Sequence, residues 1–313
     1  MLRRRDPRAE APRPPRVRCR QGGGVSDLGP GTGPLAIGPA TPEEARLIVA
    51  WAATEGWNPG LSDMEAFYGF DPEGFLVARL GAEMAACISV VAYPSGFGFL
   101  GFYICRPDLR GRGIGKALWD AALARRPLAS IGLDGVVAQQ ANYARAGFVF
   151  AHRNVRYGGR VAPPSARDPQ IEDIAPGSPL AAAVAAYDAG VYPIGRADFV
   201  RRWIAAPGQH AVALLGGDAV RGWGAIRPST DGMKIGPLFA DDAAGAAAIF
   251  AALAVVADGR PLFVDPPAVN AAAVALAEAH GLVPVFETAR MYRGPAPALD
   301  LARVFGITSF ELG

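Results

Sequence analysis

Three glycines and two arginines alternate in the stretch Arg110-Gly111-Arg112-Gly113-Ile114-Gly115, which follows an apolar strand and opens a predicted helix. Glycine lets the backbone approach a ligand and turn its N–H groups inward, while the helix N-terminus adds partial positive charge. Arg112 and Lys116 could add full charges. The loop therefore predicts a binding site for an anionic group such as a phosphate.

Two familiar phosphate-binding patterns fail in this loop because of their spacing. A Walker A loop needs Gly in place of Arg110 and Ser or Thr in place of Ala117. A dinucleotide fingerprint beginning at Gly111 needs Gly in place of Lys116, and the preceding strands suggest a meander rather than a βαβ unit. What remains is Arg-x-x-Gly-x-Gly, formed by Arg110, Gly113 and Gly115. The alternative to an anion-binding loop is a glycine-rich helix N-terminus with arginines exposed on the surface.

The elements around the loop predict a mixed α/β fold with an α+β sheet. A helix starts at the N-cap Thr41, with Pro42 in its first turn, and runs to about Thr54. Apolar patterning then gives a short helix, three meander strands and alternating helices and strands. The predicted ranges are 62–68 (helix), 74–80, 83–93 and 97–105 (strands), 113–125 (helix), 131–133 (strand), 140–146 (helix) and 148–157 (strand).

The same order of elements recurs after a Pro-rich stretch, which predicts two domains. Residues 161–170 have the composition of a linker. We therefore expect domains at 35–160 and 171–313, and the repeat is inferred from element order alone. In the second domain the strands are expected at 210–215, 220–227, 233–239, 261–264 and 283–292, and the helices up to about 205, at 242–256 and at 268–280.

With this context, the loop resembles that of the GNAT N-acetyltransferase superfamily, which binds the acetyl-CoA pyrophosphate between its fourth strand and the next helix. Tyr143-Ala144-Arg145-Ala146-Gly147-Phe148 is similar to the Tyr-x-x-x-Gly-Phe string of the same enzymes. A wider pattern resembles the two-domain YitH-type family, in which a degenerate GNAT-like domain follows the first, and covers about 35–313. It comprises residues 55–60, 133–135, 139–140 and Phe310-Glu311-Leu312-Gly313.

The resemblance implies an N-acyltransferase that moves an acetyl group from acetyl-CoA to a primary amine of a small molecule or peptide. It implies that residues 110–115 hold the cofactor, that a strand amide near Ile104 stabilises the oxyanion, and that Tyr143 protonates the departing thiolate. Asp134 and Glu55 are each either a general base or a structural hydrogen-bonding partner. Trp57 either stacks on the acceptor or anchors its loop, and Asn58 lies in the same acceptor loop.

The second domain departs from this cofactor pattern. Its corresponding helix follows Pro237, which has no backbone donor, and Asp241 and Asp242, which would repel a pyrophosphate. We therefore expect one CoA per chain. The second domain is expected to pack against the first and shape the acceptor pocket.

The amino-acid composition narrows the classes of function that remain open. The 313 residues carry a net charge of +2, and residues 1–20 hold eight Arg with only two acids, so the rest is mildly acidic and unsuited to nucleic acid. Three cysteines without a CxxC pair and three scattered histidines give no metal or disulfide pattern, which favours a reducing, cytoplasmic location. The uncharged stretch from Met84 to Cys105 is interrupted by Pro and Gly, so a hairpin is expected there instead of a membrane span.

Two rival functions stay open. One is a non-catalytic acyl-CoA-binding sensor. The other is an interaction protein that works through residues 1–34, an Arg-, Pro- and Gly-rich tail predicted to be disordered. The sequence names neither the acceptor nor the oligomeric state.

Overall fold

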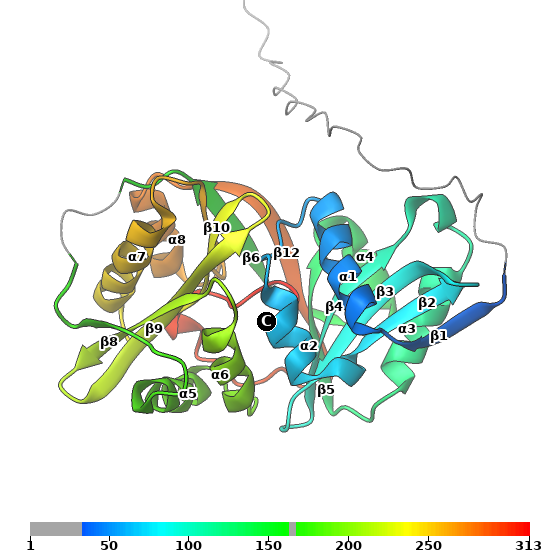
Figure 1. Ribbon diagram of the computed structural model, residues 1–313, viewed down its shortest axis with the longest axis horizontal. Coiled ribbons are helices and arrows are strands. Elements are labelled where there is room, and N and C mark those ends of the chain that lie inside the picture. Colours follow the sequence, from blue (N-terminus) through cyan, green and yellow to red (C-terminus); the bar gives the residue numbers. More distant parts are fainter. Residues whose placement is uncertain (1–32, 163–166) are drawn as a thin grey trace, which may run out of the picture. The chain divides into compact units, whose positions relative to one another are not determined.

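The computed structural model describes residues 33–162 and 167–313, and Thr32–Gly313 forms one compact unit. The predicted disordered tail, 1–34, lies almost wholly outside the described residues, as does the centre of the predicted linker. The first half of the unit contains β1 (Leu35–Pro39), α1 (Pro42–Thr54), α2 (Asp63–Phe70), β2 (Phe75–Leu80), β3 (Glu83–Ala92), β4 (Phe97–Cys105), α3 (Ile114–Ala124), β5 (Ser130–Val136), α4 (Gln140–Arg145) and β6 (Val149–Gly159) (Figure 1).

The second half repeats this order with variations. It contains β7 (Ile171–Asp173), α5 (Pro179–Val191), α6 (Ala197–Ala205), β8 (His210–Gly216), β9 (Ala219–Ser229), β10 (Gly232–Ala240), α7 (Ala243–Ala257), β11 (Leu262–Val264), α8 (Ala271–Ala279), β12 (Val283–Arg293) and β13 (Val304–Gly306). The mixed α/β class and nearly all predicted helices and strands are confirmed. Three short strands, β1, β7 and β13, were not predicted.

Local sequence explains where the helices begin. Thr41 forms a capping box at α1, because its hydroxyl accepts from the Glu44 N–H and its own N–H donates to the Glu44 carboxylate. Asp242 caps α7 by accepting from the Gly245 N–H at 2.8 Å. In the described ranges, no helix combines the length and apolar character needed to cross a bilayer.

The strands of the two halves form one sheet, in which the last long strand of each half, β6 or β12, pairs with strands of the other half. The order is β1-β2-β3-β4-β5-β12-β6-β11-β10-β9-β8-β7, with β13 paired to β10. Strand β12 of the second half therefore pairs with β5 of the first, and β6 of the first half pairs with β11 of the second. Figure 1 shows β6 and β12 running side by side between the halves. We refer to this arrangement as the strand exchange.

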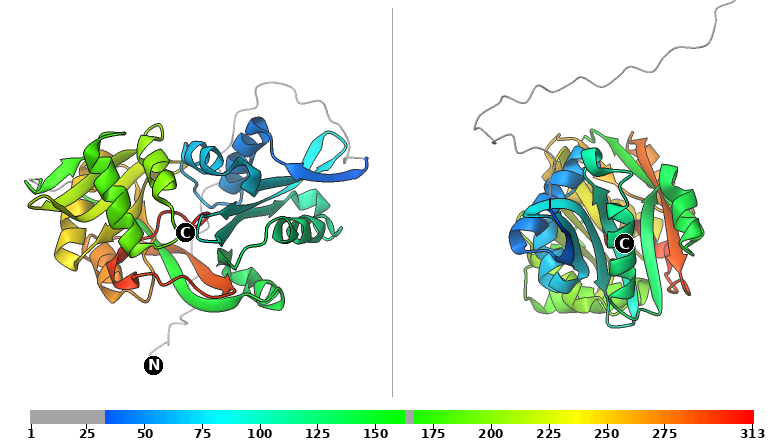
Figure 2. Two further views of the ribbon diagram at one scale, coloured as in Figure 1. Left: turned by 90° about the horizontal axis from the view of Figure 1, so that it is seen from below. Right: turned by 90° about the vertical axis from the view of Figure 1, so that its right-hand side faces the viewer.

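Aromatic packing joins the halves a second time. Phe67 of α2 stacks on Trp203 of α6, with ring centroids 5.4 Å apart and planes inclined by 4°. Both side chains are fully buried in a hydrophobic cluster that includes residues of both halves. The C-terminal residues also lie between the halves, and they are buried from Val304 onward (Figure 2). The predicted domain boundaries stay a prediction, but each half contributes to the other's packing.

Candidate active site

The glycine loop forms the N-terminus of α3 without a side-chain cap. Gly111 and Gly113 have φ angles of 77° and 82°, a left-handed conformation that glycine adopts without strain. Gly115 is needed for a different reason, because a Cβ there would lie 2.8 Å from the Tyr103 hydroxyl. The first N–H groups of α3 are therefore left for an external acceptor.

This helix end faces the larger of two hollows, which we term the outer cavity. It has a volume of about 1110 Å³ and extends from the glycine loop, along α3, to β4, β5 and α4. The basic side chains Arg110, Lys116, Arg145 and Arg293 line it, against the acids Glu55 and Asp120. Its size and its basic, amide-lined end suit a phosphate-bearing ligand.

Strands β4 and β5 separate beside this cavity. They pair in parallel only from Phe97 with Ser130 to Leu100 with Leu133. Beyond that point, β4 carries a bulge on its β3 side, where the register shifts and Phe102 adopts a φ of 48°. Ile104 follows the bulge and lines the outer cavity. The separation leaves the ends of both strands open to a ligand.

The smaller hollow, the inner recess, continues the opening between the strands. It has a volume of about 40 Å³ and shares four lining residues, Trp57, Tyr103, Val136 and Tyr143, with the outer cavity. Its other walls come from β4 and β5 and from Phe286, Thr288, Phe310 and Glu311 of the second half. Both halves thus build the far end of the site.

Tyr143 lies where the two hollows meet. Its ring stacks on Trp119 at 5.8 Å and fills the space above Gly135, where a Cβ would come within 2.2 Å of it. Burial raises the pKa of the Tyr143 phenol to about 12, so the phenol stays protonated at neutral pH. A protonated hydroxyl at this junction can donate a proton to an atom bound there.

The Asp134 carboxylate forms a buried ion pair beside the inner recess, and its role stays a prediction. Its carboxylate accepts two hydrogen bonds from Arg290 of β12, at 2.9 and 2.6 Å, and one from the Asn154 amide at 2.8 Å. Both charged side chains are fully buried. Asp134 also lines the inner recess, so these three hydrogen bonds hold its carboxylate at the wall of that hollow.

The other predicted residues divide between the hollows and their surroundings. The Glu55 carboxylate pairs with Arg110 of the cofactor loop, and Trp57 lines both hollows while its carbonyl accepts from Arg156 at 2.6 Å. Asn58 lines neither hollow, since its side chain pairs with the backbone of Asp231 in the second half. Arg112 is exposed and does not line the outer cavity.

Sequence reasoning expected the second half to help shape the site but assigned no role to the residues of that half that line the recess. Phe286, Thr288 and Glu311 reach it only because β12 joins β5 and the C-terminal segment passes beside β4. The one signal was the terminal Phe310-Glu311-Leu312-Gly313 pattern, which pointed to a family but gave no role. Long-range strand pairing leaves no local spacing from which these positions could be read.

The corresponding helix of the second half offers no such anion site. Its N-terminus is already capped by Asp242, and Asp241 pairs with Arg221 and Arg303. Across residues 33–162 and 167–313, no group of three or more His, Cys, Asp or Glu side chains is arranged to hold a metal ion. Of these two corresponding helices, α3 is therefore the one whose N-terminus has no side-chain cap.

Comparison with known proteins shows which family has this fold and site. Residues 44–148 match the acetyltransferase (GNAT) family, and residues 184–306 match an acetyltransferase (GNAT) domain. The chain belongs to the GNAT acyltransferases and has their two-domain form, as the sequence predicted. Membership of this family implies that the chain binds an acyl-CoA.

Relatives of similar length support this assignment. Holothin acyltransferase of Pseudoalteromonas sp. (strain SANK 73390) is 34% identical over 281 residues, which cover 88% of this chain and 93% of the relative. A candidate acetyltransferase structure from Pyrococcus horikoshii has a TM-score of 0.76 at 23% identity, over 89% and 96% of the two chains. A tandem GNAT protein from the clavulanic acid biosynthesis pathway has a TM-score of 0.60 at 18% identity, over 84% and 100%. These two structures share the fold.

Proposed function

We propose that this protein transfers an acetyl group from acetyl-CoA to a primary amine of a small molecule or peptide. The observation that carries the proposal is the uncapped N-terminus of α3, which opens into a cavity that leads to Tyr143 and to the separated strands β4 and β5. In this arrangement the loop holds the pyrophosphate, and the opened edge of β4 receives the extended arm of the cofactor.

Each part of the site has one task in this reaction. The glycine loop and β4 position the thioester, and the backbone N–H near Ile104 stabilises the negative charge that develops on the carbonyl oxygen. Tyr143 donates a proton to the departing sulfur. Holothin is the first acceptor to test, since an acyltransferase for it is 34% identical to this chain. A cytoplasmic location stays a prediction.

Calorimetric titration with acetyl-CoA tests the proposal. We expect one molecule bound per chain, because the uncapped N-terminus of α3 follows left-handed glycines, whereas the corresponding helix α7 is capped by Asp242. Gly113→Asp should abolish binding, since it places a negative charge and a side chain at the pyrophosphate.

Gly177→Asp is the matched control, since Gly177 has a φ of 74° and precedes the N-cap of α5 far from the loop in sequence. It carries the same backbone strain but should leave binding unchanged. Binding of two molecules, or equal binding by Gly113→Asp and the wild type, would refute the proposal. Binding without turnover of any amine would favour an acyl-CoA sensor.

A further inference from the structure

The inner recess is largely apolar, although Asp134, Thr288 and Glu311 are among the residues around it. The Asp134 side chain is fully buried in its ion pair with Arg290, and the side-chain oxygens of Thr288 and Glu311 are buried as well. The other side chains around the recess are mainly aliphatic or aromatic. Moving a charged ammonium into such a space is costly, whereas an apolar group enters it favourably.

The size of the recess limits the group that it can hold. An apolar cavity of about 150 Å³ accommodates benzene, which corresponds to roughly 25 Å³ for each carbon. At that density the recess, with its volume of about 40 Å³, holds about one or two carbons. Its mouth lies at the four residues that it shares with the outer cavity, and Tyr143 is one of them. An acyl group whose sulfur lies at Tyr143 can therefore extend its alkyl carbon into the recess.

Two aromatic side chains of the second half form one wall of the recess. Phe286 of β12 and Phe310 of the C-terminal segment pack with their ring centroids 5.9 Å apart. The Arg156 guanidinium lies 4.5 Å from the centroid of the Phe310 ring. That guanidinium is itself fixed, because it donates to Asp265 at 2.7 and 2.8 Å and to the Trp57 carbonyl at 2.6 Å. Phe310 therefore has little freedom to move away from a longer group.

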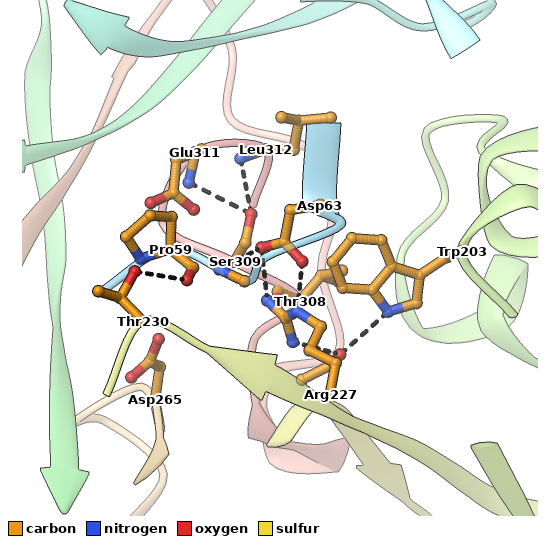
Figure 3. Close-up of polar contacts among 12 residues, drawn as sticks. Pro59, Asp63, Trp203, Arg227, Thr230, Asp265, Thr308, Ser309, Glu311 and Leu312 are labelled. Carbon is orange, nitrogen blue, oxygen red and sulfur yellow. Dashed lines mark hydrogen bonds and ion pairs between the residues drawn. The ribbon is translucent and has the colours of Figure 1, made fainter. Parts of the chain in front are cut away.

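The backbone on both sides of Phe310 is anchored too. The Ser309 hydroxyl accepts hydrogen bonds from the N–H groups of Glu311 and Leu312, at 3.3 and 3.1 Å, as Figure 3 shows. Gly101 of β4 lets this segment approach closely, since a Cβ there would lie 3.0 Å from the Glu311 Cα. The C-terminal segment is therefore fixed against β4, and it holds Phe310 at the recess.

We propose that the inner recess receives the alkyl part of the acyl group, and that Phe286 and Phe310 limit this group to acetyl or propionyl. The inference rests on the proposed function and extends it to the choice of donor. Acetyl has one carbon beyond its carbonyl and propionyl has two, which the volume of the recess accommodates. Butyryl and longer chains have to displace an aromatic ring or stay outside the recess. The second half thereby selects the donor that the first half binds.

Calorimetric titration of the full chain with CoA, acetyl-CoA, propionyl-CoA and hexanoyl-CoA tests this inference without an acceptor. Each acyl-CoA affinity is divided by the affinity of the same variant for CoA, so that effects on the rest of the cofactor site cancel. The variants are Phe310→Ala and the matched control Phe305→Ala. Phe305 is also an aromatic residue of the C-terminal region and is 2% exposed, but it packs in the core of the second half and lines neither hollow.

For wild type we expect this affinity ratio not to increase from propionyl-CoA to hexanoyl-CoA, because the added carbons find no space in the recess. Phe310→Ala removes the ring and opens the recess. Its ratio for hexanoyl-CoA should exceed its ratio for propionyl-CoA by a factor of about 10 to 60, since each further buried methylene adds about fourfold. Phe305→Ala should follow the wild-type profile.

Two results would overturn the inference: a wild-type ratio that rises steadily from acetyl-CoA to hexanoyl-CoA, or a folded Phe310→Ala that keeps the wild-type profile. The second result is the one expected if the recess serves the acceptor instead. Should Phe310→Ala fail to fold, Phe286→Ala provides the same comparison, because Phe286 is only partly buried. The wild-type profile is decisive even without a variant. Failure of wild type to bind any of the four compounds would instead remove the proposed function.

Discussion

At the scale of single residues, burial around the inner recess shifts the pKa of the residues Tyr143 and Glu311 in the same direction. Tyr143 must hold a proton until sulfur leaves, and burial helps by raising its pKa to about 12. Burial also raises the pKa of the Glu311 carboxyl. The positive charge of Lys234, whose own pKa burial lowers to about 8, partly restores the ionised form.

Tyr143→Phe tests the acid directly, since it keeps the ring that stacks on Trp119 and removes only the hydroxyl. We expect turnover to fall by a factor on the order of 10² to 10⁴, the usual effect of losing a positioned general acid. Acetyl-CoA affinity and melting temperature should stay near wild type, because the glycine loop and the core are untouched.

Tyr103→Phe is the control for Tyr143, because Tyr103 lines the same two hollows and packs on the same Trp119. It should cost far less turnover. Equal activity of Tyr143→Phe and wild type would make Tyr143 a packing residue and leave the proton to water or another side chain.

At the scale of elements, the exchange of β6 and β12 links the halves through a buried ion pair. Arg290 of β12 lies opposite Asp134 of β5 in the strand register, and the two side chains form a two-pronged contact. The pair therefore fixes the strand that brings Phe286 and Thr288 to the recess. The buried ion pair therefore joins the two halves beside the recess.

Arg290→Met should destabilise the protein by about 3 to 5 kcal/mol, because it leaves the Asp134 carboxylate buried without its cation. The double variant Asp134→Asn with Arg290→Met should recover a large part of the loss, since no charge is then left unpaired. Urea unfolding of both variants provides the measurement. If the double variant is no more stable than the single one, the ion pair does not account for the loss.

Local sequence was sufficient to predict most helices and strands and the glycine loop, but it was not sufficient to predict the residues of the inner recess. Thr41 and Asp242 mark their helix starts through short-range capping, and Gly111 and Gly113 mark the loop through backbone conformation. Arg290 pairs with Asp134 from 156 residues away in the chain, and Glu311 reaches the recess only through the path of the C-terminal segment. For that reason the sequence left the role of Asp134 open and did not single out Glu311.

At the scale of the whole molecule, the strand exchange makes the two halves depend on each other although each matches a GNAT domain separately. The first half supplies the glycine loop and Tyr143, and the second half supplies β12 and the C-terminal segment. Aromatic stacking of Phe67 on Trp203 closes the same interface elsewhere. The far end of the site therefore belongs to neither half alone.

A fragment of residues 35–160 tests this dependence. Without β12, strands β5 and β6 each lose a neighbour and expose unpaired backbone groups, a known route to self-association. We expect the fragment to form oligomers or aggregates in size-exclusion chromatography, whereas residues 33–313 stay in solution as a defined species. Mixing the fragment with residues 171–313 during refolding should restore the defined species, because β12 is then available to both strands. If the fragment instead runs as a monomer and binds acetyl-CoA as tightly as the full chain, β6 can take the place of β12 beside β5, and the exchange is not needed to form the cofactor site.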